Sequence, residues 1–195
     1  MTLLRVVDIA MLRYFIAAPL PDDSRDCLLA VQPSPIPGIR LIGREELHLT
    51  LHMVGELTAQ SRKVVHRALE KITMRAFTIT IKGLGTFSMG GRPNAIWSRV
   101  EPGADLLALH HSVGTALTNA IGFQVEDRPY TPHITLARLN APISLDFIRD
   151  YIIERQEFYI PAIRITHFAL YASNHVASIP QYREEAVFEL IETSL

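Results

Sequence analysis

Hydrophobic residues recur along the chain in short runs that partly alternate with polar positions, which is the pattern of half-buried β-strands. The runs that predict strands are rich in Ile, Val, Phe, Tyr or Thr and cover residues 12–18, 47–54, 77–81, 95–100, 131–136, 163–172 and 186–191. A Pro- and Gly-rich segment, residues 32–38, predicts a loop rather than a domain boundary.

Apolar residues spaced three and four apart predict amphipathic helices between these strands. One stripe covers residues 64–72, with Thr58 or Ser61 as its cap, and another covers residues 106–120, with Gly122 placed to end it. Weaker helical patterns cover two further segments, residues 24–31 and 145–155. Because strands and helices alternate without regular βαβ spacing, we expect an α+β fold with largely antiparallel sheets.

A five-residue pattern occurs twice, as Leu47-His48-Leu49-Thr50-Leu51 and as Pro132-His133-Ile134-Thr135-Leu136. Each copy falls in a predicted strand, and each half of the chain contains a predicted helix. We therefore expect a single domain, residues 1–195, built from two similar lobes. A pseudo-twofold axis would relate the lobes, each a largely antiparallel sheet with flanking helices, and they would enclose a central cleft.

The repeated histidines and threonines suit phosphodiester chemistry. Alternate side chains of a strand share a face, so His48 lies with Thr50, and His133 with Thr135. With an ordinary pKa near 6.5, one imidazole can take a proton from water while the other, protonated, gives one to a leaving sugar oxygen. The hydroxyls can donate hydrogen bonds to phosphate oxygens, and this arrangement requires no metal or other cofactor.

Four further residues are candidates for the cleft. Arg138 has the planar fork that suits phosphate, but strict alternation places it on the face opposite His133, so a bulge or an early strand end is needed. Arg128 is a second candidate cation. His52 would share the face of His48 in a regular strand, and Tyr130 is an aromatic residue that could stack a base or join the core.

Composition and charge narrow the function classes. The 195 residues are 48% hydrophobic and 20% charged, as in globular proteins, and the net charge of −1 creates no strong attraction to DNA or to an anionic membrane. A single cysteine, Cys27, excludes an intrachain disulfide and a multi-cysteine zinc site. A zinc site from His48 and His52 is disfavoured, because their spacing suits a helix. Without a membrane span or a clear signal peptide, we expect a soluble, cytoplasmic protein.

Longer segments around the two motifs resemble a known family. The His-x-Thr-x pairs resemble those of the 2H phosphoesterase superfamily, and more closely those of the RNA 2',3'-cyclic phosphodiesterases, formerly called 2'-5' RNA ligases. The supporting segments follow the order of that family and are RYFIA at 13–17, HLTLHMVGEL at 48–57, RPYTPHITLAR at 128–138 and FALYAS at 168–173.

The resemblance implies a two-lobed fold and hydrolysis of a 2',3'-cyclic phosphate at an RNA end, or on a nucleoside, to a 2'-phosphomonoester. It implies that His48 donates a proton to the leaving 3' oxygen and that His133 activates water. Thr50 and Thr135 would hold the phosphate, and Arg138 matches an arginine of the family that reaches it. We expect no cofactor and no obligate protein partner.

The chain also departs from the family pattern. Met53 stands where an aromatic residue is usual, His52 where a small or basic one is frequent, and Thr131 where many members have histidine. Residues 1–10 have no counterpart, so Met11 is a candidate initiator, or residues 3–9 an added strand. Two alternatives stay open, namely 2'-5' RNA ligation through the same cleft and a nucleotide-binding module without turnover.

Overall fold

The computed structural model describes residues 12–176 and 179–192. The expected N-terminal extension, residues 1–10, lies outside the described residues, as do Met11 and the added strand at residues 3–9. Among the residues described, no helix is long and apolar enough to span a bilayer.

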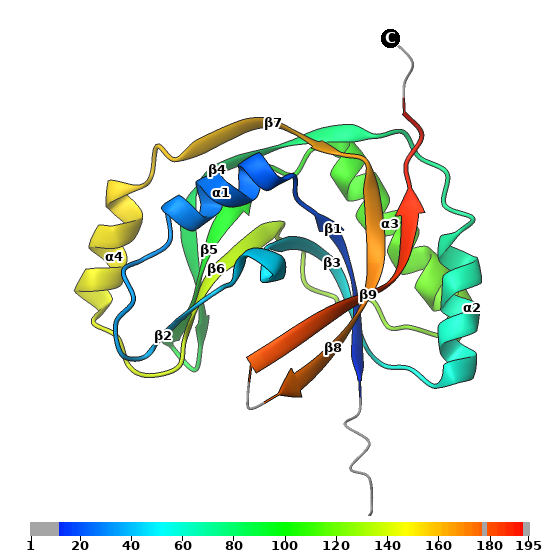
Figure 1. Ribbon diagram of the computed structural model, residues 1–195, viewed down its shortest axis with the longest axis horizontal. Coiled ribbons are helices and arrows are strands. Elements are labelled where there is room, and N and C mark those ends of the chain that lie inside the picture. Colours follow the sequence, from blue (N-terminus) through cyan, green and yellow to red (C-terminus); the bar gives the residue numbers. More distant parts are fainter. Residues whose placement is uncertain (1–11, 177–178, 193–195) are drawn as a thin grey trace, which may run out of the picture.

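Two antiparallel sheets form the framework (Figure 1). The first sheet has four strands, in the order β3 (His48–Glu56), β1 (Arg13–Pro19), β8 (His167–Val176) and β9 (Ile179–Glu189). The second has five strands, in the order β2 (Ile39–Leu41), β6 (His133–Leu139), β5 (Arg92–Val100), β4 (Phe77–Met89) and β7 (Tyr159–Ile165). Each sheet therefore contains one of the two histidine strands, β3 or β6.

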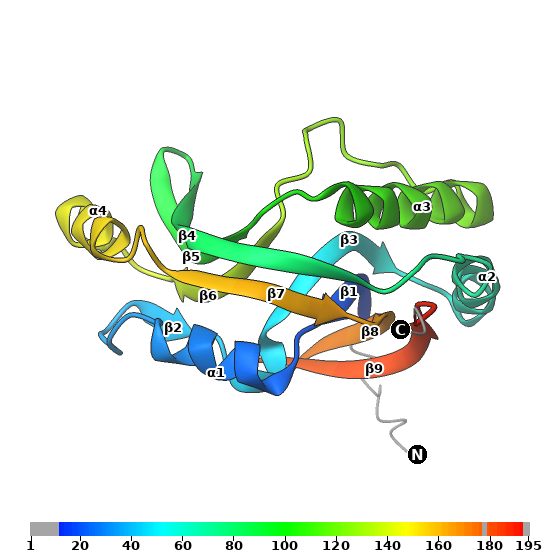
Figure 2. The same cartoon turned by 90° about the horizontal axis from the view of Figure 1, so that it is seen from above.

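Four α-helices and one 3-10 helix are described with these sheets: α1 (Asp22–Ala30), η1 (Arg44–Glu46), α2 (Ala59–Leu69), α3 (Ala104–Ile121) and α4 (Leu145–Glu154). Helices α2 and α3 pack against each other at one end of the molecule, and α3 also contacts β3 and β4 (Figure 2). Helix α1 contacts β7, and α4 contacts β4. The predicted α+β class is confirmed.

The helix ends follow the local signals in the sequence. The hydroxyl of Thr58 accepts a hydrogen bond from the backbone N–H of Ser61, so Thr58 caps α2. Helix α3 ends at Gly122, whose φ of 67° is a left-handed conformation that glycine adopts without strain. The stripes of both helices bury their apolar residues, among them Val65 and Leu109.

Some strand boundaries differ from the prediction. The run at residues 163–172 is split at Thr166, because β7 ends in the second sheet and β8 begins in the first. Strand β4 continues past Ile81 to Met89, where it forms a hairpin with β5. The short strand β2 was not predicted, because its three residues are too few to show a period. An apolar run indicates extended backbone, but it does not say which sheet the strand joins.

The two histidine strands lie against each other. Strand β3 is an edge strand of the first sheet, β6 is an inner strand of the second, and residues of the two strands are in contact. The fold therefore brings together two segments that are separated in sequence by α2, the β4–β5 hairpin and α3.

Candidate active site

His48 stands at the start of β3, surrounded by aromatic rings from three other strands. Its imidazole stacks on Phe15 of β1 with centroids 4.9 Å apart, meets Tyr182 of β9 edge-on at 5.4 Å, and lies 6.3 Å from Tyr171 of β8. Burial among these rings lowers the pKa of His48 to about 4, although the backbone carbonyl of Glu46 favours the protonated form. The free site therefore holds this ring neutral at neutral pH.

His133 stands at the start of β6 and has a comparable setting. Its ring meets Phe87 edge-on at 4.7 Å and Trp97 at 5.9 Å. Its Nδ1 lies 2.8 Å from the backbone oxygen of Thr131, and because a carbonyl only accepts, Nδ1 carries the proton of the neutral ring. Nε2 is then left to accept a proton. Burial lowers the pKa of His133 as well.

The charges of this region act on both imidazoles. A protonated His133 lowers the pKa of His48, and the guanidinium of Arg138 lowers the pKa of both rings. Arg25 of α1 adds a smaller effect on His48. Because Arg138 acts on both imidazoles and His133 acts on His48, these three groups share one electrostatic environment. We call His48, Thr50, His133, Thr135 and Arg138 the two-histidine site.

Each histidine strand contains a β-bulge at the same place in the motif. In β3, Thr50 pairs with Ala17 and His52 pairs with Ile16, so Leu51 is the extra residue. In β6 the register shifts in the same way, and Leu136 is the extra residue. A bulge reverses the face to which the following side chains point. The matching bulges support the pseudo-twofold relation between the lobes.

The bulge in β6 returns Arg138 to the face of the site. Arg138 pairs with Ala95 and Thr135 pairs with Trp97, two residues of β5 that share a face. The guanidinium is thereby aimed to the same side as His133, and its positive charge lowers the pKa of that ring. A bulge and an early strand end are the two features that would let Arg138 reach the site, and β6 has the bulge.

The bulge in β3 has the opposite consequence for His52, and the prediction that His52 shares the face of His48 is wrong. His52 is 6% exposed and points toward α3. Its Nε2 donates a hydrogen bond of 2.9 Å to the backbone oxygen of His110, and the two rings stack at 4.2 Å. His48 and His52 therefore point to opposite faces of β3, which also separates the two nitrogen ligands of the disfavoured zinc site.

The remaining candidates lie near the site without forming its centre. The hydroxyl of Tyr130 donates a hydrogen bond of 2.7 Å to the backbone oxygen of Thr50, and its ring stacks on His110 at 3.9 Å. Tyr130 thus holds β3 from the side of α3. The side chain of Arg128 is 80% exposed and forms an ion pair with Glu126, although its charge also lowers the pKa of His133.

The second residue after each bulge distinguishes the two lobes. Met53 pairs with Phe15 on the face of His48 and is 58% exposed, and its counterpart in the other copy is Arg138. One lobe therefore supplies a cation where the other supplies an exposed thioether. Sequence reasoning did not single out Tyr171 and Tyr182, because no local pattern shows which rings meet across four strands.

Comparisons with known proteins agree with this geometry. A profile of the 2'-5' RNA ligase superfamily matches residues 31–176. An RNA 2',3'-cyclic phosphodiesterase of Archaeoglobus fulgidus is 27% identical over 182 residues, which cover 91% of this chain and all of the relative. An RNA 2',3'-cyclic phosphodiesterase of Geobacillus stearothermophilus is 28% identical over 91% of this chain, but this chain spans only 57% of that relative.

Solved structures show the same fold. The protein TT0787 of Thermus thermophilus superposes with a TM-score of 0.75 at 24% identity, covering 91% of this chain and 97% of the other. The LigT protein of E. coli complexed with 3'-AMP superposes with a TM-score of 0.73 at 24% identity, covering 92% and 98%. With three quarters of its residues matched by the profile, the chain belongs to the 2'-5' RNA ligase superfamily.

Proposed function

We propose that this protein hydrolyses 2',3'-cyclic phosphates at RNA ends or on nucleosides and leaves a 2'-phosphomonoester. The observation that carries the proposal is the pair of bulged His-x-Thr strands, which bring two imidazoles and one guanidinium into a single electrostatic environment. The curated relatives named RNA 2',3'-cyclic phosphodiesterase support the same substrate class.

In the proposed reaction, Nε2 of His133 takes a proton from water, and the water oxygen forms a bond to phosphorus. The bond from phosphorus to the 3' oxygen breaks, and His48 gives that oxygen its proton. The hydroxyls of Thr50 and Thr135 donate hydrogen bonds to the non-bridging oxygens, and Arg138 offsets their negative charge. Which histidine is the acid follows the resemblance of the two motifs to the family.

Substrate binding also supplies the protonation state that this scheme needs. Burial keeps the pKa of both imidazoles below the ordinary value in the free protein. A phosphodiester anion placed beside them favours their charged forms and raises both pKa values. The acid is then protonated as the substrate binds. Because desolvation of its ring favours loss of that proton, His48 would donate readily to the leaving oxygen.

The proposal is tested by product analysis with the four nucleoside 2',3'-cyclic phosphates and with a short RNA that ends in a cyclic phosphate. We expect a 2'-phosphomonoester in each case where turnover occurs, with activity retained in excess EDTA. His48→Ala and His133→Ala should each lower kcat by ~10² or more. His111→Ala, which removes an exposed imidazole of α3, is the matched control.

Two results would overturn the proposal. Hydrolysis at the native rate by either site variant would exclude the acid–base scheme. Nucleotide binding without turnover would show that the protein is a nucleotide-binding module and not a hydrolase. The same incubation, with an RNA acceptor added, measures 2'-5' joining as the reverse reaction through the same groups. We expect hydrolysis to dominate because water is in large excess over any RNA hydroxyl.

A further inference from the structure

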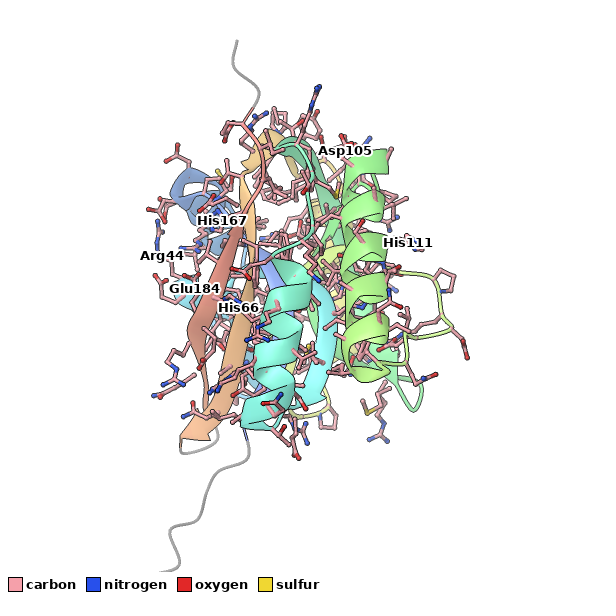
Figure 3. All side chains as sticks on the ribbon, turned by 90° about the vertical axis from the view of Figure 1, so that its right-hand side faces the viewer. Arg44, His66, Asp105, His111, His167 and Glu184 are labelled. Atoms are coloured by element: carbon pink, nitrogen blue, oxygen red, sulfur yellow. The ribbon has the colours of Figure 1, made fainter. Side chains whose placement is uncertain are left out.

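A second group of basic residues lies on helix α2, outside the two-histidine site. Arg62, Lys63, His66 and Arg67 line a pocket of about 310 Å³ between α2 and strands β8 and β9. Figure 3 looks at this side of the molecule and shows His66 on α2 beside the two strands. We call this cavity the α2 pocket. Leu170 of β8 and Ala186 of β9 are its apolar lining residues.

The lining of the α2 pocket carries an excess of positive charge. Glu185 is the one acidic residue in this lining among the residues described. Its carboxylate already lies 3.5 Å from Arg62 and forms a second ion pair with Arg183. Lys63 and Arg67 are both exposed, and no carboxylate of the described chain lies within ion-pair distance of either.

The spacing of these cations is unfavourable for the helix itself. Lys63 and Arg67 are four residues apart, so their side chains are neighbours on the surface of α2, and two like charges there destabilise a helix. Arg62 is held toward the pocket by the hydroxyl of Tyr14 at 3.3 Å. A protein with a net charge of −1 thus concentrates unneutralised cations beside a cavity, which is the arrangement that binds an anion.

The α2 pocket lies on the reverse face of the sheet that carries His48. Tyr171 faces His48, whereas its neighbour Leu170 points the other way and lines the pocket. Strand β9 is an edge strand of this sheet, and its Tyr182 contacts the ring of His48, so the site extends to the edge beyond which the reverse face begins. Arg183 follows Tyr182 in sequence and forms an ion pair with Glu185 of the pocket lining.

We propose that the α2 pocket binds a phosphate group through Lys63, Arg67 and Arg62. The phosphate is either part of an RNA chain whose 3' end occupies the two-histidine site or part of a free phosphate compound. The RNA ligand rests on the proposed function. Phosphate binding itself does not depend on that function, because a phosphate anion fits the cationic lining whatever the protein does at His48 and His133.

The test measures binding, with two probes that the protein does not turn over. One probe is a short fluorescent single-stranded RNA with an ordinary 3' hydroxyl, followed by anisotropy between 50 and 200 mM salt, a range in which phosphate contacts are resolved. The other is inorganic phosphate, followed by ³¹P NMR. The variant is Lys63→Glu with Arg67→Glu. The control is Arg75→Glu with Lys82→Glu, which changes the net charge equally at exposed positions outside the pocket.

For an RNA ligand, we expect the slope of log affinity against log salt to decrease in magnitude by about 0.7, which is the contribution of one phosphate of a single strand. The affinity at low salt should fall roughly tenfold, and the control should retain the slope of the native protein. If the pocket variant no longer binds inorganic phosphate but keeps the salt dependence of RNA binding of the native protein, the ligand is a free phosphate compound.

The proposal is overturned if the pocket and control variants weaken RNA binding equally while inorganic phosphate binds the native protein and the pocket variant alike. These results are independent of catalysis. A protein that failed to hydrolyse cyclic phosphates could still bind both probes in the α2 pocket, and an active hydrolase could bind neither there.

Discussion

Replacing His48 by glutamine tests whether the aromatic surroundings of this ring oppose its protonation. Burial lowers the pKa of His48 to about 4 in the folded protein, whereas an unfolded chain has the ordinary value near 6.5. Between these two values the unfolded state binds more protons than the folded state. Stability is therefore full above about pH 6.5 and decreases as the pH falls toward 4.

The size of this effect follows from the difference between the two pKa values. One pH unit corresponds to about 1.36 kcal/mol for a group that is protonated in only one state. Between pH 7 and pH 4.5, His48 therefore lowers the free energy of unfolding by about 2 kcal/mol. Glutamine has no titrating group, so His48→Gln should lose about 2 kcal/mol less than the native protein over this interval.

The assay is urea unfolding at pH 7 and at pH 4.5, with the change between the two pH values compared for the native protein and the variant. Comparing changes cancels the effect of glutamine on packing and the contributions of the other titrating groups. His111→Gln, at an exposed position of α3, is the control for a histidine-to-glutamine change outside the site. An equal loss of stability in His48→Gln and the native protein would refute the argument from burial.

Three further predictions concern the surroundings of the site. Burial lowers the pKa of both site histidines, so the free protein with one of the two imidazoles protonated becomes rare above pH 6.5. We therefore expect kcat/KM for a cyclic nucleotide to fall about tenfold per pH unit above pH 6.5. A profile that stays flat to pH 8 would contradict this prediction. Gly85→Ala places a methyl group 2.6 Å from the ring of Trp97, so thermal unfolding should show a loss of stability of roughly 1–3 kcal/mol. Gly103→Ala is the control, because its methyl group has no atom within 4 Å and should leave the stability nearly unchanged. Tyr130→Phe removes the hydrogen bond to the backbone of Thr50 and should lower the free energy of unfolding by about 1 kcal/mol, as measured by urea titration; an unchanged value would show that the bond is dispensable.

Local sequence signals predicted the helices and strands better than they predicted which strands pair with each other. Thr58 begins α2 and Gly122 ends α3 as expected, because capping depends on a few consecutive residues. The break at Thr166 was missed, since one continuous apolar run supplies strands to both sheets. Hydrophobicity reports burial of a strand and carries no information on which neighbour it pairs with.

The same division applies to the two-histidine site. The repeated motif by itself determined that each histidine shares a face with its threonine, because two residues of separation always restores the face in a regular strand. Only the tertiary structure decided the faces of His52 and Arg138, through the bulges at Leu51 and Leu136. A bulge is a mismatch between two paired strands, so it depends on contacts between distant segments and leaves no mark in the period of either one.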